Sequence, residues 1–122
     1  MSTVELTKDN FEETVTGSDI VLIDFWAAWC GPCRMFAPVF EKAAERHPDI
    51  VFGKVDTEAQ PELAATFQIS SIPTLMAVRD RTVLYARPGA LPAQGLEELI
   101  AKIRAVDMDA VRRTTADTAD SH

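Results

Sequence analysis

The feature that most constrains the fold is a pair of cysteines, Cys30 and Cys33, placed between two different hydrophobic patterns. Before the pair, residues 20–26 form a long apolar run that begins with four consecutive aliphatic side chains. Such a run is typical of a strand that is covered on both faces of a sheet. After the pair, apolar side chains recur at helical spacing over residues 35–45. The sequence therefore places the two cysteines where a buried strand ends and an amphipathic helix begins.

Similar patterns along the whole chain predict an α/β fold with the element order β-α-β-α-β-α-β-β-α. Thr7 is expected to cap the first helix. Helices that alternate with strands imply parallel crossovers, and the last two strands form an antiparallel hairpin. We therefore expect a mixed, mostly parallel central sheet of about five strands, covered by helices on both faces. The predicted strands are residues 3–6, 20–26, 50–56, 74–79 and 83–87, and the predicted helices are residues 8–15, 32–47, 61–67 and a last one opened by Pro92.

The turn of the predicted hairpin, residues 79–82, reads Arg-Asp-Arg-Thr and contains no glycine. The shortest hairpin turns need a positive φ, which glycine adopts most readily. This turn is therefore expected to be longer or strained, and the register of the last two strands stays open.

The length of 122 residues fits a single domain. We assign residues 1–106 to this domain and residues 107–122 to a C-terminal extension. In the extension, Asp107 is expected to cap a short helical turn through Arg113, and the polar segment after it is expected to be frayed.

Charge and composition exclude several classes of function. The net charge is −7, which argues against binding to nucleic acid or to anionic membranes and suits a monomer. No apolar run reaches the roughly 18 residues of a membrane span, and no basic segment followed by an apolar one marks a signal peptide. We therefore expect a cytoplasmic protein, in which closely spaced cysteines favour catalysis or metal binding over a structural disulfide.

The spacing of the cysteines predicts a redox pair. In the first turn of a helix, positions i and i+3 are neighbours, so Cys30 and Cys33 lie near the separation that a disulfide needs. The free amides of the helix start stabilise a thiolate at Cys30, which is the nucleophile, whereas Cys33 lies deeper and resolves the mixed disulfide. Gly31 keeps the approach open, and Pro32 stiffens the first turn.

Two alternatives to a redox pair are a structural disulfide and half of a zinc site. A disulfide that closes so small a loop removes little entropy from the unfolded chain. Zinc needs a second pair of ligands, and the chain offers only His47 and His122 as imidazole donors. We therefore expect no metal, and we favour the redox interpretation that a Cys-x-x-Cys beside a βαβ pattern indicates.

Three segments of the chain together match the pattern of a known family. Residues 24–35 read Asp-Phe-Trp-Ala-Ala-Trp-Cys-Gly-Pro-Cys-Arg-Met and resemble the active-site segment of the thioredoxin family almost residue for residue. Residues 72–74, Ile-Pro-Thr, look like its cis-proline loop, and residues 88–91 look like the glycine loop before its last helix. The resemblance runs from about residue 3 to residue 103, and it implies a thioredoxin fold.

Asp24 is the second candidate for a catalytic residue, because it is an acid within an otherwise apolar strand. Burial raises the pKa of a lone carboxyl group, which can then accept a proton near neutral pH. Its expected role is to accept the proton of Cys33, and the alternative is an aspartate at the solvated end of the strand. The resemblance supports the proton role and adds Lys54 as a charge partner of Asp24; the alternative for Lys54 is a solvated strand lysine.

The resemblance also implies a cis bond before Pro73, which would place this loop beside the cysteines. The Ile72 backbone is then available to pair with an extended substrate. The alternative, favoured without the resemblance, is an ordinary proline at the start of a strand. Trp29, Ile72 and Gly89 are expected to border a small apolar patch on which protein substrates dock.

The function implied by the resemblance is that of a protein-disulfide reductase. It reduces disulfides in client proteins and is itself reduced by a thioredoxin reductase that draws on NADPH. No bound cofactor is needed, because the electrons reside on Cys30 and Cys33. One rival is a thiol oxidant or isomerase of the same fold, and the other is a redox-silent scaffold or binding subunit.

Overall fold

The computed structural model describes residues 2–113, which form one five-stranded sheet covered by helices. The sheet order is β1-β3-β2-β4-β5, so that β2 lies at its centre. The sequence of elements agrees with the order predicted from hydrophobic periodicity. The elements are β1 (Thr3–Glu5), α1 (Phe11–Thr16), β2 (Ile20–Trp26), α2 (Gly31–Arg46), β3 (Val51–Asp56), α3 (Pro61–Thr66), β4 (Thr74–Arg79), β5 (Thr82–Pro88) and α4 (Ala93–Ala105).

The sheet is mixed, as expected. Strand β3 pairs with β1 and with β2 in parallel, whereas β4 pairs with β2 and with β5 in antiparallel fashion. Parallel and antiparallel ladders are therefore equal in number, so the parallel share is smaller than the sequence suggested. The carboxyl ends of β2 and β3 lie at the same edge of the sheet, where the chain enters α2 and α3.

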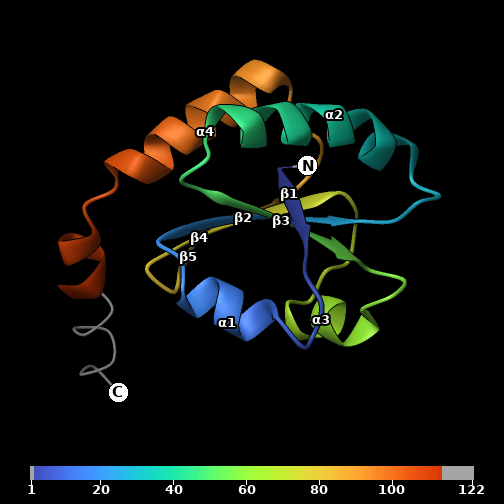
Figure 1. Ribbon diagram of the computed structural model, residues 1–122, viewed down its shortest axis with the longest axis horizontal. Helices are drawn as coiled ribbons and strands as arrows, with labels where there is room; N and C mark the ends of the chain where they lie inside the picture. Colours follow the sequence, from blue (N-terminus) through green and yellow to red (C-terminus); the bar gives the residue numbers. More distant parts are fainter. Residues whose placement is uncertain (1, 114–122) are drawn as a thin grey trace.

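Two hydrophobic cores lie on the two faces of the sheet, and β2 contributes to both. Leu22 packs in the core under α2 and α4, whereas Val21, Ile23 and Phe25 pack in the core toward α1 and α3. Figure 1 shows the first pair of helices above the sheet and the second pair below it. Since side chains alternate along a strand, Asp24 lies on the same face as Leu22, under α2.

The first helix begins later than the sequence predicted. Helix α1 starts at Phe11, because residues 7–10 form a separate turn in which the Asn10 side chain accepts a hydrogen bond from the Thr7 amide at 2.7 Å. The Thr7 hydroxyl accepts a hydrogen bond from Asp9 N, so Thr7 caps this turn and not the helix. The prediction of a helix from residue 8 was therefore wrong by three residues.

The hairpin turn is short and its backbone is strained. Arg79 pairs directly with Thr82, so that only Asp80 and Arg81 form the loop. Both have positive φ angles, 51° and 63°, which side chains other than glycine adopt at a cost. Of the two expected outcomes, the strained turn is confirmed and the longer turn is wrong. The register of β4 and β5 shifts once, between Ala77 and Val78.

The chain continues past α4 into a further helical segment, residues 108–113. The Asp107 carboxylate accepts a hydrogen bond from the Ala110 amide at 3.1 Å, which confirms the predicted cap. Met108 is buried, and Arg112 forms an ion pair with Asp80 of the hairpin turn. The division at residue 106 stays a prediction, and the expected frayed segment from residue 114 lies outside the described residues. No helix within residues 2–113 has the length and apolar character needed to cross a membrane.

The strained turn leads to a stability prediction. Replacing Arg81 by Gly should raise the free energy of unfolding by about 0.5–1 kcal/mol, because glycine adopts a positive φ without the steric cost. Urea denaturation followed by circular dichroism measures the change. Thr82→Gly, one residue further in a strand, is the control and should destabilise; an Arg81→Gly variant that is less stable than the parent would contradict the assignment of strain.

Candidate active site

The cysteine pair is built into the first turn of α2. Cys30 is the N-cap residue, with an extended backbone, and its Sγ accepts a hydrogen bond from the Cys33 amide at 3.2 Å. The sulfur thus takes the position that a capping oxygen usually holds. Pro32 lies in the first turn, where its missing amide hydrogen leaves no partner unsatisfied. The two Cα atoms are 5.2 Å apart, and the two residues form a disulfide, as the spacing predicted.

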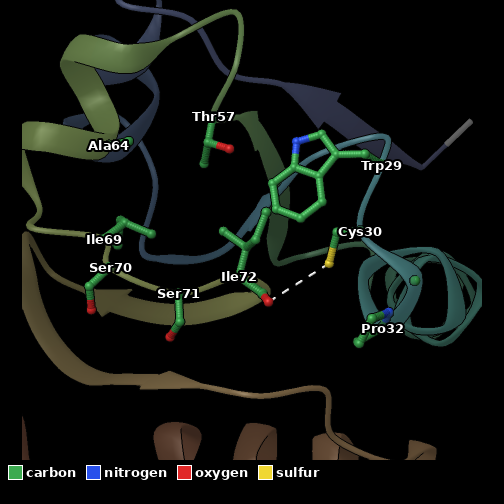
Figure 2. Close-up of a pocket in the computed structure, with 10 residues that line it drawn as sticks. Trp29, Cys30, Pro32, Thr57, Ala64, Ile69, Ser70, Ser71 and Ile72 are labelled. Atoms are coloured by element: carbon green, nitrogen blue, oxygen red, sulfur yellow. Dashed lines mark hydrogen bonds between the residues drawn. The ribbon is translucent and has the colours of Figure 1, made fainter.

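The two sulfur atoms differ in what they face. Both residues are buried, with 4% of Cys30 and 2% of Cys33 exposed, so the expected difference in depth is small. Cys30 Sγ lies 3.7 Å from the carbonyl oxygen of Ile72, across the mouth of a groove (Figure 2). Cys30 lines this groove, and Cys33 is not among the residues that do. A partner that enters the groove therefore meets Cys30 first.

The groove has a volume of about 430 Å³ and is mostly apolar. Figure 2 shows Cys30 and Pro32 on one side of it and Ala64 and Ile69 on the other. Five of the predicted site residues line it, which are Trp29, Cys30, Gly31, Pro32 and Ile72. The sequence analysis missed the other five, which are Thr57, Ala64, Ile69, Ser70 and Ser71. The last three precede Ile72 directly, so their position was accessible from the sequence; Thr57 and Ala64 carry no signal of their own.

The loop opposite the cysteines contains the Ile72–Pro73 bond, which is cis. The Pro73 carbonyl accepts a hydrogen bond from the Gly89 amide at 2.8 Å. Gly89 has a φ of 110°, a conformation that side chains rarely adopt. The structure therefore joins the loops of residues 72–74 and 88–91, although Gly89 is not among the residues lining the groove.

Trp29 is the most prominent exposed group at the site, with 67% of its surface accessible. Its Nε1 donates a hydrogen bond to Glu58 Oε1 at 2.8 Å, which fixes the indole beside the groove. Glu58 follows β3 in an acidic, polar segment and was not predicted as a site residue. A pairing of two surface side chains 29 residues apart leaves no pattern in the sequence.

Asp24 lies on the face of β2 that α2 covers, and it is 1% exposed. Neither carboxylate oxygen has a hydrogen-bond partner among residues 2–113. Burial raises the pKa of Asp24 to about 7, and the charge of Lys54 opposes this shift. The alternative of an aspartate at a solvated strand end is therefore wrong. A buried, unpartnered carboxyl group that titrates near neutral pH can exchange a proton with a neighbouring acid.

Lys54 is the direct neighbour of Asp24 on the adjacent strand β3. Its ammonium nitrogen lies 4.8 Å from the ring centre of Trp26, a cation–π contact. Within residues 2–113, no ion pair joins Lys54 to Asp24. The lysine acts on the carboxyl group through space, and it is half-buried and not fully solvated.

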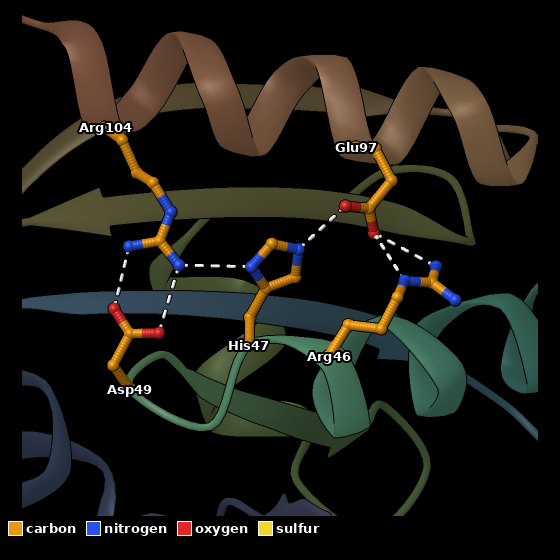
Figure 3. Close-up of polar contacts among 5 residues, drawn as sticks. All are labelled: Arg46, His47, Asp49, Glu97 and Arg104. Carbon is orange, nitrogen blue, oxygen red and sulfur yellow. Dashed lines mark hydrogen bonds and ion pairs between the residues drawn. The ribbon is translucent and has the colours of Figure 1, made fainter.

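The candidate zinc ligands that the structure describes, Cys30, Cys33 and His47, do not form a metal site. Within the part of the chain that the structure describes, no three His, Cys, Asp or Glu side chains are grouped to bind a metal ion. His47 is already in contact with two side chains of α4: its Nε2 lies 2.7 Å from Glu97 Oε1, and its Nδ1 lies 3.1 Å from Arg104 Nη2 (Figure 3). His122 lies outside the described residues.

Comparison with known proteins agrees with this geometry. Residues 2–114 match the family model described as Thioredoxin. The chain belongs to the thioredoxin family. It is 64% identical over 116 residues to a protein named as a thioredoxin 2 in Streptomyces coelicolor, an alignment that covers 95% of this chain and 87% of the relative. A mutant thioredoxin from Halobacterium salinarum has a similar structure, with a TM-score of 0.78 and 29% identity over 86% of this chain and 93% of that one.

Another kind of relative matches this chain over a small part of its own length. A protein disulfide-isomerase of Mus musculus is 47% identical over 81 residues, which is 63% of this chain but 13% of the relative. As a thioredoxin-family protein with a closed Cys30–Cys33 pair, the chain is an oxidoreductase, a protein-disulfide reductase. Members of this family normally carry no prosthetic group, and the redox-active group is the cysteine pair itself.

The burial of Asp24 predicts how stability depends on pH. The pKa of this carboxyl group rises from 3.8 to about 7 on folding. The folded state therefore binds more protons between these values, and stability falls as the pH rises from about 4 to 7. Asp24→Asn should raise the free energy of unfolding at pH 8 by about 2–4 kcal/mol and have a much smaller effect at pH 4.

Denaturant titration at the two pH values measures this difference. Asp19→Asn, which changes an acid in the turn before β2, serves as the control. A gain from Asp24→Asn that is equal at pH 4 and pH 8 would show that the carboxyl group is ionised at both.

Proposed function

We propose that the protein reduces disulfides of client proteins with Cys30 as nucleophile, Cys33 as resolving cysteine and Asp24 as proton acceptor. The observation that carries this proposal is the different placement of the two sulfur atoms: Cys30 borders the groove, and Cys33 does not. The position of Asp24, buried and unpartnered on the face covered by α2, supports its role in proton transfer.

In the first step, the Cys30 thiolate attacks one sulfur of the client disulfide. A bond forms between Cys30 Sγ and that sulfur, the client S–S bond breaks, and the second client sulfur leaves as a thiolate that takes up a proton. The start of α2 favours the attacking anion, because the Cys33 amide already donates to Cys30 Sγ and the positive end of the helix dipole lies there.

In the second step, Cys33 resolves the mixed disulfide. Its thiol gives a proton to Asp24, and the resulting thiolate attacks Cys30 Sγ, which releases the first client sulfur as a thiolate. Two electrons have then passed from the cysteine pair to the client, the Cys33 proton is held by Asp24, and the two client thiolates take up protons from solvent. Lys54 moderates the proton affinity of Asp24, since its charge favours the ionised carboxylate.

The groove supports an extended client segment as the substrate. The exposed indole of Trp29 and the apolar side chain of Ile72 offer contact area on two sides of Cys30, while Gly31 leaves the approach open. The Ile72 backbone, whose carbonyl oxygen lies 3.7 Å from Cys30 Sγ, is our candidate for pairing with the client main chain. Gly89 holds the Pro73 loop in place through its hydrogen bond.

The remaining partners follow from the chemistry of the pair. The oxidised pair has to be reduced again, and we assign this step to a thioredoxin reductase that uses NADPH, so that NADPH binds the reductase and not this chain. We place the protein in the cytoplasm as a monomer, with residues 1–106 as the catalytic domain and residues 107–122 as an extension.

The redox potential separates this function from its closest rival. We expect the Cys30–Cys33 pair to titrate in thiol–disulfide buffers with a midpoint more negative than about −250 mV, which is typical of a reductant. A midpoint between about −120 and −180 mV would assign the protein to the oxidants or isomerases. Cys30→Ser is the control, because it has no pair to titrate, and a parent protein without a reversible transition would instead be a scaffold.

The order of the two cysteines can be tested by trapping. Cys33→Ser should accumulate a mixed disulfide with a reducible client such as insulin, because the second step is blocked. Cys30→Ser should accumulate at least about tenfold less, since Cys33 does not border the groove. Non-reducing gel electrophoresis with mass spectrometry measures both, and equal trapping by the two variants would contradict the assignment of Cys30 as the attacking residue.

A further inference from the structure

A transverse row of charged side chains crosses the sheet at Asp24. Lys54 on β3 is paired with Asp24 on one side and with Glu5 of β1 on the other. On the far side of Asp24, the row continues through Leu75 to Arg87 of β5. Directly paired residues point to the same face of a sheet, so that these side chains all lie on the face covered by α2. Lys54 therefore stands between two acids of its own row.

Helix α2 adds another acid above this row. Both carboxylate oxygens of Glu41 are fixed over β1: Oε1 accepts a hydrogen bond from Ser2 N at 2.9 Å, and Oε2 accepts one from Thr3 Oγ1 at 2.9 Å. These hydrogen bonds lower the pKa of Glu41, and the charge of Lys54 lowers it further. The same lysine thus acts on Glu41 and on Asp24, which belong to different elements of the fold.

The position of the Lys54 ammonium is compatible with attraction by both Glu41 and Asp24. The ammonium lies over the ring of Trp26, and no acid within residues 2–113 forms an ion pair with it. A lysine side chain has a flexible stem, so its ammonium can approach whichever carboxylate attracts it more strongly. An ionised Glu41 on one side opposes a movement of the ammonium toward Asp24 on the other.

We propose that Glu41 is a positioning residue for the thiol–disulfide exchange. Its carboxylate attracts the Lys54 ammonium and thereby keeps the ammonium from pairing with Asp24. This inference rests on the proposed role of Asp24 as proton acceptor. In the presence of Glu41, Asp24 retains a high proton affinity, which a base for the Cys33 thiol requires. The N-terminal segment takes part through Ser2 and Thr3, which hold the Glu41 carboxylate in place.

The sign of the effect does not depend on how far the lysine moves. Removing the charge of Glu41 removes a negative charge from the face of the sheet that carries Asp24, and it also frees Lys54 to approach Asp24. Both changes stabilise the Asp24 carboxylate and lower its pKa. Glu5 is exposed, so its influence is weakened by solvent. The other charged groups on the surrounding elements stay unchanged in Glu41→Gln. They are Asp56 on β3, Arg79 on β4, Arg87 on β5, and Arg34, Lys42, Glu45 and Arg46 on α2.

The experiment compares Glu41→Gln with Glu45→Gln in the full chain. The first variant keeps a side-chain amide that can bond to Ser2 and Thr3, and the second removes the same charge from an exposed position one turn further along α2. Carbon-13 NMR of the Asp24 carboxyl group in the oxidised protein measures its pKa directly. We expect Glu41→Gln to lower this pKa by roughly 0.5–1 unit, less than a charge in direct contact would produce, and Glu45→Gln to leave it unchanged.

A kinetic measurement then separates this inference from the proposed function. The pH profile of client release from the mixed disulfide should move to lower pH in Glu41→Gln, and Glu41→Gln should add nothing in an Asp24→Asn background. No shift of the Asp24 pKa, or equal shifts in the Glu41 and Glu45 variants, would overturn the role of Glu41. The expected pKa shift combined with an unchanged profile would instead remove Asp24 from the proposed mechanism.

Discussion

The burial of β2 on both faces is the constraint on which the rest of the structure depends. Six of its seven residues are buried, and they supply side chains to the cores on both faces of the sheet. Each large aliphatic side chain buried in this way contributes roughly 1.5–3 kcal/mol. That gain offsets the cost of keeping one carboxyl group, Asp24, away from water in the same strand. The strand also fixes the point at which the chain leaves the sheet, and this point is the cysteine turn.

The site combines this rigid strand with a helix start whose cap is itself the reactive atom. Cys30 Sγ receives the Cys33 amide hydrogen bond, so the group that opens α2 is the group that exchanges disulfides. A capping interaction with a backbone amide becomes stronger when the acceptor carries a charge. The start of α2 therefore stabilises the thiolate that disulfide exchange requires, and the thiolate in turn stabilises the start of α2.

Hydrophobic periodicity was sufficient to predict the element order, because the buried strand and the amphipathic helices have distinct repeats. It failed where a side chain competes with the helix for backbone groups, as Asn10 does before α1. The cis bond at Pro73 was accessible only through family resemblance, since the local sequence fits a trans bond equally well. Glu58 and Glu41 were missed for another reason. Each contacts residues that are distant in the sequence, and such contacts leave no periodic pattern in the sequence.

The contacts in Figure 3 add a further consequence for α2. Arg46 and His47, at the end of this helix, both reach Glu97, while Arg104 joins His47 and Asp49 to α4. Since an arginine can only donate, Nδ1 of His47 has to accept, and Nε2 carries the hydrogen that faces Glu97. The helix is thus fastened at the end opposite the cysteines. We therefore expect opening and closing of the disulfide to change the first turn of α2 without displacing the C-terminal end of the helix.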